Sequence, residues 1–147
     1  MTCKPFDNCF DFESQNIKIV TFTDMKSSTT YTYENNSLNT LTKYRVDGCL
    51  INDERPKCDY LLLNCSKKKS YFIELKGSDL IKAVEQINSS IDILHNKIND
   101  YSVEGRIVLT RVNTIDLKNS KLLKLEKRIK QLNGVLKKQT RQMTEVN

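Results

Sequence analysis

An acidic pair and a lysine lie within two short apolar segments near the middle of the sequence. Asp59 begins the segment DYLLL, and Glu74 and Lys76 end the segment SYFIELK. Because side chains two residues apart in a strand lie on the same face, Glu74 and Lys76 are expected to point the same way. Carboxylates next to a lysine can bind a divalent metal ion and act on a phosphate ester. These three residues are therefore the first candidates for chemistry.

The two apolar segments are expected to pair as antiparallel strands, which brings the acids together. In a register that places Leu63 opposite Ser70, the two carboxylates face each other directly. Like charges in that position repel unless a cation or a shared proton lies between them. Oxygen ligands favour Mg²⁺ or Mn²⁺, which usually keep several waters and take one or two carboxylates plus substrate phosphate. We therefore expect a Mg²⁺ (or Mn²⁺) site for phosphodiester hydrolysis, with Lys76 offsetting the developing negative charge.

The spacing of these residues resembles the signature of a known nuclease family. Asp59, fourteen intervening residues and then Glu74-Leu75-Lys76 are similar to the motif of the PD-(D/E)XK nuclease superfamily, whose members share the restriction-endonuclease-like fold. The resemblance implies a Mg²⁺-dependent endodeoxyribonuclease with Asp59 and Glu74 as metal ligands and Lys76 as the catalytic lysine. Some branches carry a glutamine in the next helix, and Gln86 in AVEQI is similarly placed to orient metal-bound water or a backbone phosphate.

The same resemblance supplies the expected biological setting and a third acid. Members of the family act in prokaryotic or phage DNA processing and in anti-phage defence, and some resolve DNA junctions. They commonly draw a further acidic residue from a helix before the strands, and no such helix is predicted here. Glu34 and Asp47 are the substitutes, and we favour Asp47 in YRVDG as a metal ligand because it ends a predicted strand. Cys58 also stands where proline often precedes the aspartate.

The short motif is not specific by itself, because an acidic-x-Lys sequence also occurs at 24–26 and at 116–118. Neither occurrence has a partner strand with an aspartate at hairpin distance, and neither leads directly into a glycine and a capped helix. Without a metal, Glu74 and Lys76 would form a surface ion pair on a half-exposed sheet, contributing about 0–1 kcal/mol. The alternative function is a catalytically inactive nucleic-acid- or protein-binding module of the same fold. Stabilisation by Mg²⁺ or Mn²⁺ would distinguish the two functions.

Strands and helices alternate along the chain in an order that could position this site. Period-two or β-branched runs predict strands at 17–23, 29–33, 41–51, 57–64, 70–76 and 103–112. Apolar residues at steps of three and four predict helices over 80–98 and 118–133, with Ser78 capping the first and Gly134 ending the second. The first sixteen residues have no period, and a short strand could begin at Val135. This order predicts an α/β (α+β) fold, and the resemblance makes it a restriction-endonuclease-like mixed central β-sheet flanked by helices.

Length and composition indicate a single domain. The 147 residues are 38% hydrophobic and 29% charged, which suits one compact core. We expect one restriction-endonuclease-like domain over 1–140, with its core at about 41–135, and a polar tail over 141–147. No apolar run approaches the roughly eighteen residues of a membrane span, and we expect no secretory leader. The expected location is cytoplasmic, in a prokaryotic cell or a phage- or virus-infected host, without a membrane partner.

Positive charge is concentrated towards the C-terminus. Residues 1–100 contain 13 Lys and Arg against 14 Asp and Glu, whereas residues 101–147 contain 11 against 4. Such a segment suits a polyanion such as DNA, or it is the solvated side of a helix. The basic residues expected on the second helix are Lys118, Lys121, Lys124, Lys127, Arg128 and Lys130. DNA is the expected partner, and a homodimer or a partner protein is expected because so small a core leaves little surface for sequence readout.

Cysteine and histidine offer weaker candidates. The five cysteines are Cys3, Cys9, Cys49, Cys58 and Cys65. Their spacing contains no C-x-x-C, so a zinc site is disfavoured, and the single histidine, His95, is far from them in sequence. We expect reduced, partly buried thiols. Cys49 and Cys58 flank one turn, which leaves a redox-sensitive pair there as the second alternative.

Overall fold

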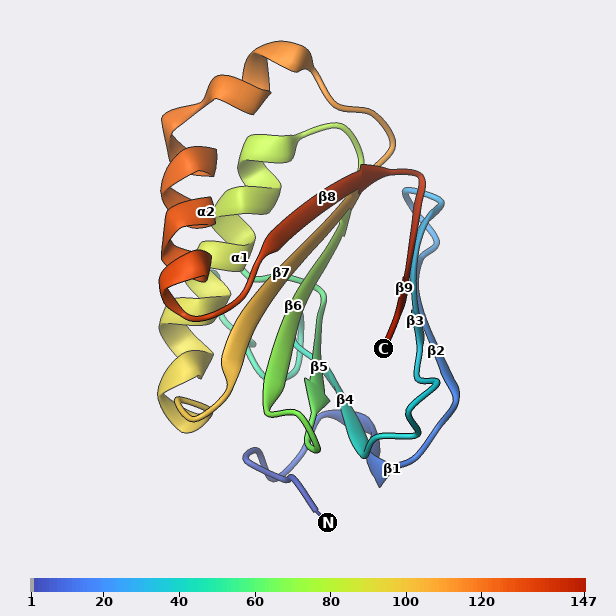
Figure 1. The fold of residues 1–147 in the computed structure, drawn as a ribbon. Helices are drawn as coiled ribbons and strands as arrows, with labels where there is room; N and C mark the ends of the chain where they lie inside the picture. Colours follow the sequence, from blue (N-terminus) through green and yellow to red (C-terminus); the bar gives the residue numbers. More distant parts are fainter. Residues whose placement is uncertain (1) are drawn as a thin grey trace.

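The computed structural model describes residues 2–147, which form two sheets and two α-helices in a mixed α/β arrangement (Figure 1). The large sheet has the strand order β1-β4-β5-β6-β7-β8, and the smaller sheet has the order β2-β3-β9. The large sheet consists of β1 (Phe10–Gln15), β4 (Leu41–Arg45), β5 (Tyr60–Asn64), β6 (Lys69–Lys76), β7 (Ser102–Leu109) and β8 (Leu136–Thr140). The smaller sheet consists of β2 (Ile19–Asp24), β3 (Thr29–Glu34) and β9 (Gln142–Val146). The α-helices are α1 (Leu80–Leu94) and α2 (Ser120–Gln131), and short 3₁₀ helices cover His95–Lys97 and Thr114–Lys118. Within residues 2–147, no helix has the length and apolar character needed to cross a membrane.

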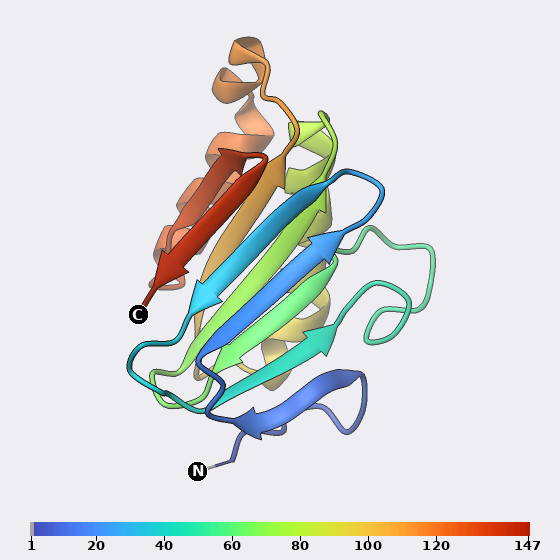
Figure 2. The ribbon, with the colours of Figure 1, turned by 90° about the vertical axis from the view of Figure 1, so that its right-hand side faces the viewer.

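The large sheet lies between the two α-helices and the smaller sheet. α1 and α2 cover one face, and Figure 2 looks onto the other face, which β2, β3 and β9 cover. Alternating side chains of β5 and β6 supply both interfaces. Leu61 and Phe72 pack with residues of the helices, whereas Leu62 and Ile73 pack with the smaller sheet. Burial on both faces explains why these strands are almost continuously apolar, and the α/β (α+β) prediction is confirmed at this level.

Strand directions bring several chain segments to one end of the large sheet. β4, β5 and β6 form an antiparallel meander, and β6, β7 and β8 run parallel. α1 connects β6 to β7 and α2 connects β7 to β8, so both helices begin at the end where β6 and β7 finish. The turn between β2 and β3 lies at the same end of the molecule (Figure 1). We call this end the carboxyl end of the sheet, after the parallel strands that finish there.

The β5–β6 hairpin has the register expected from the sequence. Leu63 lies opposite Ser70, and Tyr60 lies opposite Ile73. β5 begins at Tyr60 rather than at residue 57, so Asp59 stands directly before the strand. The strands predicted over 41–51 and 103–112 also finish early, because the chain leaves the sheet at the carboxyl end to form loops.

The ends of both helices differ slightly from prediction. Asp79, not Ser78, caps α1, and its carboxylate accepts a hydrogen bond at 3.0 Å from an amide of the first helical turn. After α2, Asn133 rather than Gly134 takes the left-handed conformation, with a φ of 68°. Gly134 is needed for a different reason, because a Cβ at this position would overlap the carbonyl oxygen of Val103 in β7. The glycine therefore serves the close approach of two chain segments rather than the end of the helix.

Strands at both ends of the chain are missing from the prediction. The irregular lead-in contains β1, whose pairing with β4 is interrupted by register shifts, and Ser14 within it has a φ of 50°. The polar tail expected over 141–147 contains β9, which pairs in parallel with β3. Arg106 of β7 anchors β9, because its buried guanidinium forms ion pairs with Glu145 of β9 and Glu104 of β7. β1 alternates apolar and polar residues only over its first four positions, and β9 shows no such alternation, so periodicity gave too short a signal to predict either strand.

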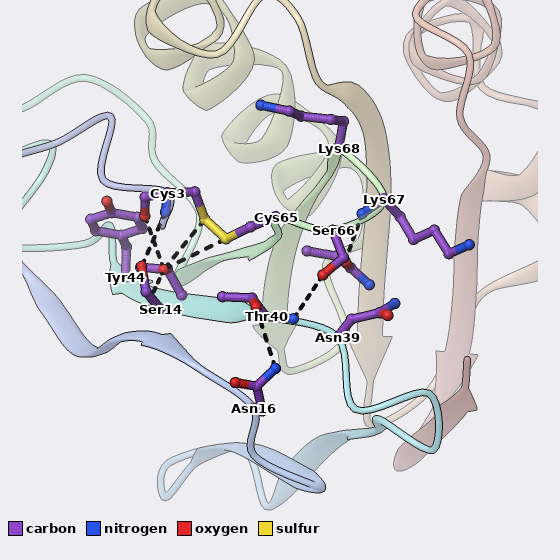
Figure 3. Close-up of a disulfide and its surroundings, with 12 residues drawn as sticks. Cys3, Ser14, Asn16, Asn39, Thr40, Tyr44, Cys65, Ser66, Lys67 and Lys68 are labelled. Atoms are coloured by element: carbon purple, nitrogen blue, oxygen red, sulfur yellow. Dashed lines mark hydrogen bonds between the residues drawn. A yellow bond between two sulfur atoms is a disulfide. The ribbon is translucent and has the colours of Figure 1, made fainter. Parts of the chain in front are cut away.

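Two disulfides anchor the N-terminal segment, which contradicts the expectation of reduced thiols. Cys3 is bonded to Cys65 and Cys9 to Cys49, leaving Cys58 as the free, buried cysteine among residues 2–147. Figure 3 shows the first of these bonds joining the N-terminal segment to the start of the β5–β6 turn. The alternative pair of Cys49 and Cys58 is also wrong. The bonds join residues 62 and 40 positions apart, which the spacing of cysteines along the chain cannot indicate.

Candidate metal centre

All five residues predicted for the site line one cavity of about 540 Å³ at the carboxyl end of the sheet. Asp59 directly precedes β5, and Glu74 and Lys76 lie at the end of β6. Gln86 lies in α1, and Asp47 lies in the loop after β4. The fold therefore brings these side chains to one place from four separate parts of the chain.

Asp59 is held by the backbone of β6. Its amide donates a hydrogen bond to the carbonyl oxygen of Ile73 at 3.1 Å, and its Oδ2 accepts one from the amide of Leu75 at 2.8 Å. These two bonds flank Glu74, the residue that the hairpin register places across from Asp59. The position of the Asp59 carboxylate is thus fixed by main-chain groups rather than by a flexible side-chain partner.

Glu74 is the most unusual residue of the site. Its side chain is only 2% exposed, and its Oε1 has no hydrogen-bond partner among residues 2–147. Leaving a buried polar atom unpaired costs about 1–3 kcal/mol. The half-exposed surface ion pair considered as the alternative is wrong, because Glu74 is buried and no ion pair joins it to Lys76 in the described chain.

Burial and neighbouring charges keep a proton on the acidic pair. Burial, together with the charge of Asp59, raises the pKa of Glu74 to about 9, although Lys76 opposes this shift. Burial raises the pKa of Asp59 to about 6, and the charges of Asp24 and Asp47 add to that effect. At neutral pH the metal-free pair therefore carries a proton on Glu74 and a negative charge on Asp59. This is the shared-proton arrangement that two facing carboxylates require without a cation.

Asp24 is a further acid of the cavity, although its sequence context predicts no role for it. It ends β2, and its carboxylate accepts hydrogen bonds from the Lys26 amide and the Ser27 hydroxyl, each at 3.0 Å. The packing of the smaller sheet over the large one brings this turn to the cavity, and no local pattern encodes that packing. Glu34, considered as a substitute acid, lies at the opposite end of β3.

Asp47 reaches the cavity from a loop that is fixed on two sides. The amides of Val46 and Asp47 both point at the carbonyl oxygen of Asp59, at 2.9 and 3.4 Å. On the other side, the disulfide between Cys9 and Cys49 ties the loop to the N-terminal segment. Main-chain hydrogen bonds to Asp59 and a disulfide therefore hold the loop that carries Asp47.

The oxygen atoms of the site fit a hard cation held by two carboxylates. Among residues 2–147, no three Asp, Glu, His or Cys side chains converge closely enough to hold a metal ion. The unpaired Oε1 of Glu74 and the carboxylate of Asp59 offer two oxygen ligands, which suits Mg²⁺ or Mn²⁺ with other positions left to water and phosphate. Asp47, expected as a third ligand, lines the cavity without completing such a group.

Comparisons with known proteins do not assign a role to these residues. The chain matches no protein-family model, no curated protein and no solved structure. What the cavity can do therefore follows from the groups that line it.

Lys76 and Gln86 complete a surface suited to a phosphate ester. Lys76 adds a positive charge beside the acidic pair, where it can attract a phosphate oxygen. Gln86 donates a hydrogen bond from Nε2 to the carbonyl oxygen of Lys57 at 3.2 Å, and its buried Oε1 has no partner within the described part of the chain. An amide oxygen held in this way can accept a hydrogen bond from a water molecule.

Cys58 lies next to Asp59, but its thiol is unsuited to act as a nucleophile. The residue is fully buried, and burial raises the pKa of the thiol far above its ordinary value. Its amide donates a hydrogen bond to the hydroxyl of Ser90 at 2.8 Å, which ties the segment directly before β5 to α1. Cys58 therefore supports the position of Asp59 through packing.

Proposed function

We propose that this protein is a metal-dependent nuclease of the PD-(D/E)XK type that hydrolyses phosphodiester bonds in DNA. The observation that carries the proposal is the carboxyl group of Glu74, which is buried beside Asp59 with an oxygen that no group of residues 2–147 pairs. A buried pair of carboxyl groups can ionise fully only when it binds something of opposite charge. A divalent cation is the simplest ligand that satisfies the unpaired oxygen of Glu74 and the carboxylate of Asp59 together.

The order of elements supports this assignment. β4, β5 and β6 form a meander, α1 follows directly, and β7 returns parallel to β6. This is the order expected of a restriction-endonuclease-like core within the mixed α/β fold. Asp24 precedes the meander in sequence and lines the cavity, so it is a candidate for the upstream acid that the family commonly takes from a helix.

Each group of the cavity has a role in this reaction. Asp59 and Glu74 would hold Mg²⁺ (or Mn²⁺), an ion that lowers the pKa of water and stabilises negative charge on a phosphoryl group. Glu74 must release its proton for both carboxylates to act as ligands. Lys76 offsets the negative charge that develops on the phosphate, and Gln86 accepts a hydrogen bond from a water through its free Oε1. Asp47 adds negative potential that favours the cation.

Cleavage assays with matched variants test the proposal. Labelled single-stranded, duplex and branched DNA are incubated with the wild type, Glu74→Gln, Lys76→Ala and the control Lys69→Ala, with Mg²⁺, with Mn²⁺ and with EDTA. Lys69 and Lys76 lie at opposite ends of β6, so both substitutions remove one lysine from the same strand. We expect metal-dependent cleavage by the wild type and the control, and a loss of roughly 100-fold or more in the two site variants. Absence of cleavage on every substrate, or equal cleavage by all four proteins, would overturn the proposal.

A second candidate function is a catalytically inactive module that binds nucleic acid or a protein. It is favoured by one observation, namely that no three metal-binding side chains converge within residues 2–147. Thermal unfolding with and without Mn²⁺ separates the two candidates, because a ligand that binds only the folded state raises the unfolding temperature. A nuclease site gives metal-dependent stabilisation that Glu74→Gln removes, whereas an inert module gives none.

A further inference from the structure

The net positive charge of the protein comes from α2, β8 and the residues beside them. Residues 118–141 contain nine Lys or Arg and a single acidic residue, Glu126, which gives a net charge of +8. The rest of the chain contains 15 basic and 17 acidic residues. One side of the molecule therefore carries more than the whole positive excess of the protein.

Within residues 2–147, most of these basic residues have no acidic partner. The paired residues are Lys121 with Glu85, Arg128 with Asp92, and Lys137 with Glu145. In the described chain the six others form no ion pair within 4 Å, and they are Lys118, Lys124, Lys127, Lys130, Lys138 and Arg141. Unpaired like charges held close together repel and destabilise the folded chain, so they favour an anionic ligand.

Five of the six unpaired residues lie on α2, on β8 or directly after β8. Lys124, Lys127 and Lys130 recur every third residue on the exposed side of α2, whose opposite side is buried. Lys127 and Lys130 flank a groove between α2 and the start of β8. β8 is the edge strand of the large sheet next to α2 (Figure 1), and it carries Lys138 with Arg141 directly after it. We call Lys124, Lys127, Lys130, Lys138 and Arg141 the basic track.

The basic track leads towards the candidate metal centre. Thr140 at the end of β8 lies opposite Leu109 of β7, and Leu109 lies opposite Lys76 of β6. Arg141, the next residue, donates a hydrogen bond from its amide to the carbonyl oxygen of Leu109 at 2.6 Å. Two strand spacings of about 4.8 Å therefore separate this end of the track from the strand that carries Lys76. A chain of phosphates lying on the track would reach the carboxyl end of the sheet, where the cavity opens.

We infer that the basic track binds the sugar–phosphate backbone of a nucleic acid and directs it to the cavity. The inference rests on the proposed function, because a phosphodiester site at the end of the track is what favours a nucleic acid over other polyanions. Lys121 and Arg128, although on the same helix, are occupied by acidic partners and contribute little. A backbone bound in this way releases counterions, so the affinity falls steeply with salt concentration.

Binding in EDTA tests the basic track without interference from cleavage. Fluorescence anisotropy with labelled single-stranded and duplex oligonucleotides is measured over a range of NaCl concentrations. The track variants are Lys124→Gln/Lys127→Gln/Lys130→Gln and, separately, Lys138→Gln/Arg141→Gln. The control, Lys67→Gln/Lys68→Gln/Lys69→Gln, removes the same charge as the triple track variant from the β5–β6 turn, at the opposite end of the sheet. Thermal unfolding of each variant verifies that it folds.

The track predicts a clear difference between the variants. We expect the triple track variant to bind about tenfold or more weakly, with the slope of log affinity against log salt reduced by roughly 0.7–0.9 for each lost phosphate contact. The double variant should show a smaller loss in the same direction, and the control should stay within about twofold of the wild type. Equal losses in track and control variants, no nucleic-acid binding by the wild type, or binding to anionic lipid vesicles instead would overturn the inference.

The outcome separates the track from the nuclease proposal. A wild type that binds through the track but cleaves no DNA refutes the nuclease and leaves the track. A wild type that cleaves DNA, with binding unchanged in both track variants, refutes the track and leaves the nuclease.

Discussion

Replacing Glu74 by glutamine should stabilise the metal-free protein at neutral pH. The pKa of Glu74 is raised from 4.5 to about 9, chiefly by burial, so the folded chain keeps a proton that the unfolded chain releases above pH 4.5. The folded state therefore binds more protons than the unfolded state between these pH values, and stability falls as pH rises through that window. The stabilising contribution of the protonated carboxyl is complete below pH 4.5 and is lost progressively up to pH 9.

The size of the effect follows from the width of this window. Each pH unit between 4.5 and 9 lowers the free energy of unfolding by about 1.4 kcal/mol. At pH 7 the loss of stability due to Glu74 is therefore about 3 kcal/mol. Glutamine has nearly the same shape and cannot ionise, and its amide can donate to Asp59 as the protonated carboxyl does. We expect Glu74→Gln to unfold roughly 6–12 °C above the wild type at pH 7, and at nearly the same temperature at pH 5.

Thermal unfolding in EDTA at pH 5, 6, 7 and 8, followed by circular dichroism or calorimetry, measures this effect. Glu54→Gln is the matched control, because Glu54 is an exposed acid of the loop that precedes Asp59, and its unfolding temperature should follow the wild type at every pH. If Glu74→Gln is less stable than the wild type, or more stable by the same amount at every pH, Glu74 is ionised or satisfied by protein groups. Either result would refute the argument that burial keeps Glu74 protonated in the metal-free protein.

Three further perturbations test the surroundings of the site. Asp24→Asn keeps the shape of the β2–β3 turn but removes a charge, so it should weaken Mn²⁺ binding by several-fold in calorimetric titration. Ser27→Ala removes two hydrogen bonds of the turn but no charge, so it should leave Mn²⁺ binding unchanged. Equal affinities in all three proteins would exclude an electrostatic role for Asp24. Cys49→Ser opens the disulfide with Cys9 and should lower the free energy of unfolding by about 4 kcal/mol in urea titrations, and an unchanged midpoint would mean that the bond does not form. Arg106→Met leaves buried carboxylates on β7 and β9 without their cation and should cost about 3–5 kcal/mol in the same assay, with a cost below about 1 kcal/mol arguing against a buried network.

The hairpin and the helix that carry the site could be predicted because their signals are local. Strand alternation and a short turn suffice to set Leu63 against Ser70, and this register places Asp59 across from Glu74. Helical spacing after Gly77 is enough to carry Gln86 back towards the same strands. The residues of the site that are close in sequence were therefore accessible from the sequence alone.

The remaining features depend on contacts between distant parts of the chain. Asp24 belongs to the site only because the smaller sheet packs over the large one, and β9 joins that sheet through pairing with β3, more than a hundred residues earlier. β9 also has only one buried apolar side chain, Met143, and relies on the ion pair of Glu145 with Arg106. The two disulfides likewise follow from the path of the N-terminal segment beside β4. No periodicity or motif expresses such contacts.

The cleavage rate of DNA in Mg²⁺, compared between the wild type and Glu74→Gln, tests the central claim most directly. Glutamine has nearly the same shape as glutamate, so a change in rate reports on the carboxylate that would hold the cation. The account predicts that the wild type cleaves DNA only with a divalent cation and that Glu74→Gln is slower by roughly 100-fold or more. The same rate in both proteins, or no cleavage by a wild type that is correctly folded, would contradict it.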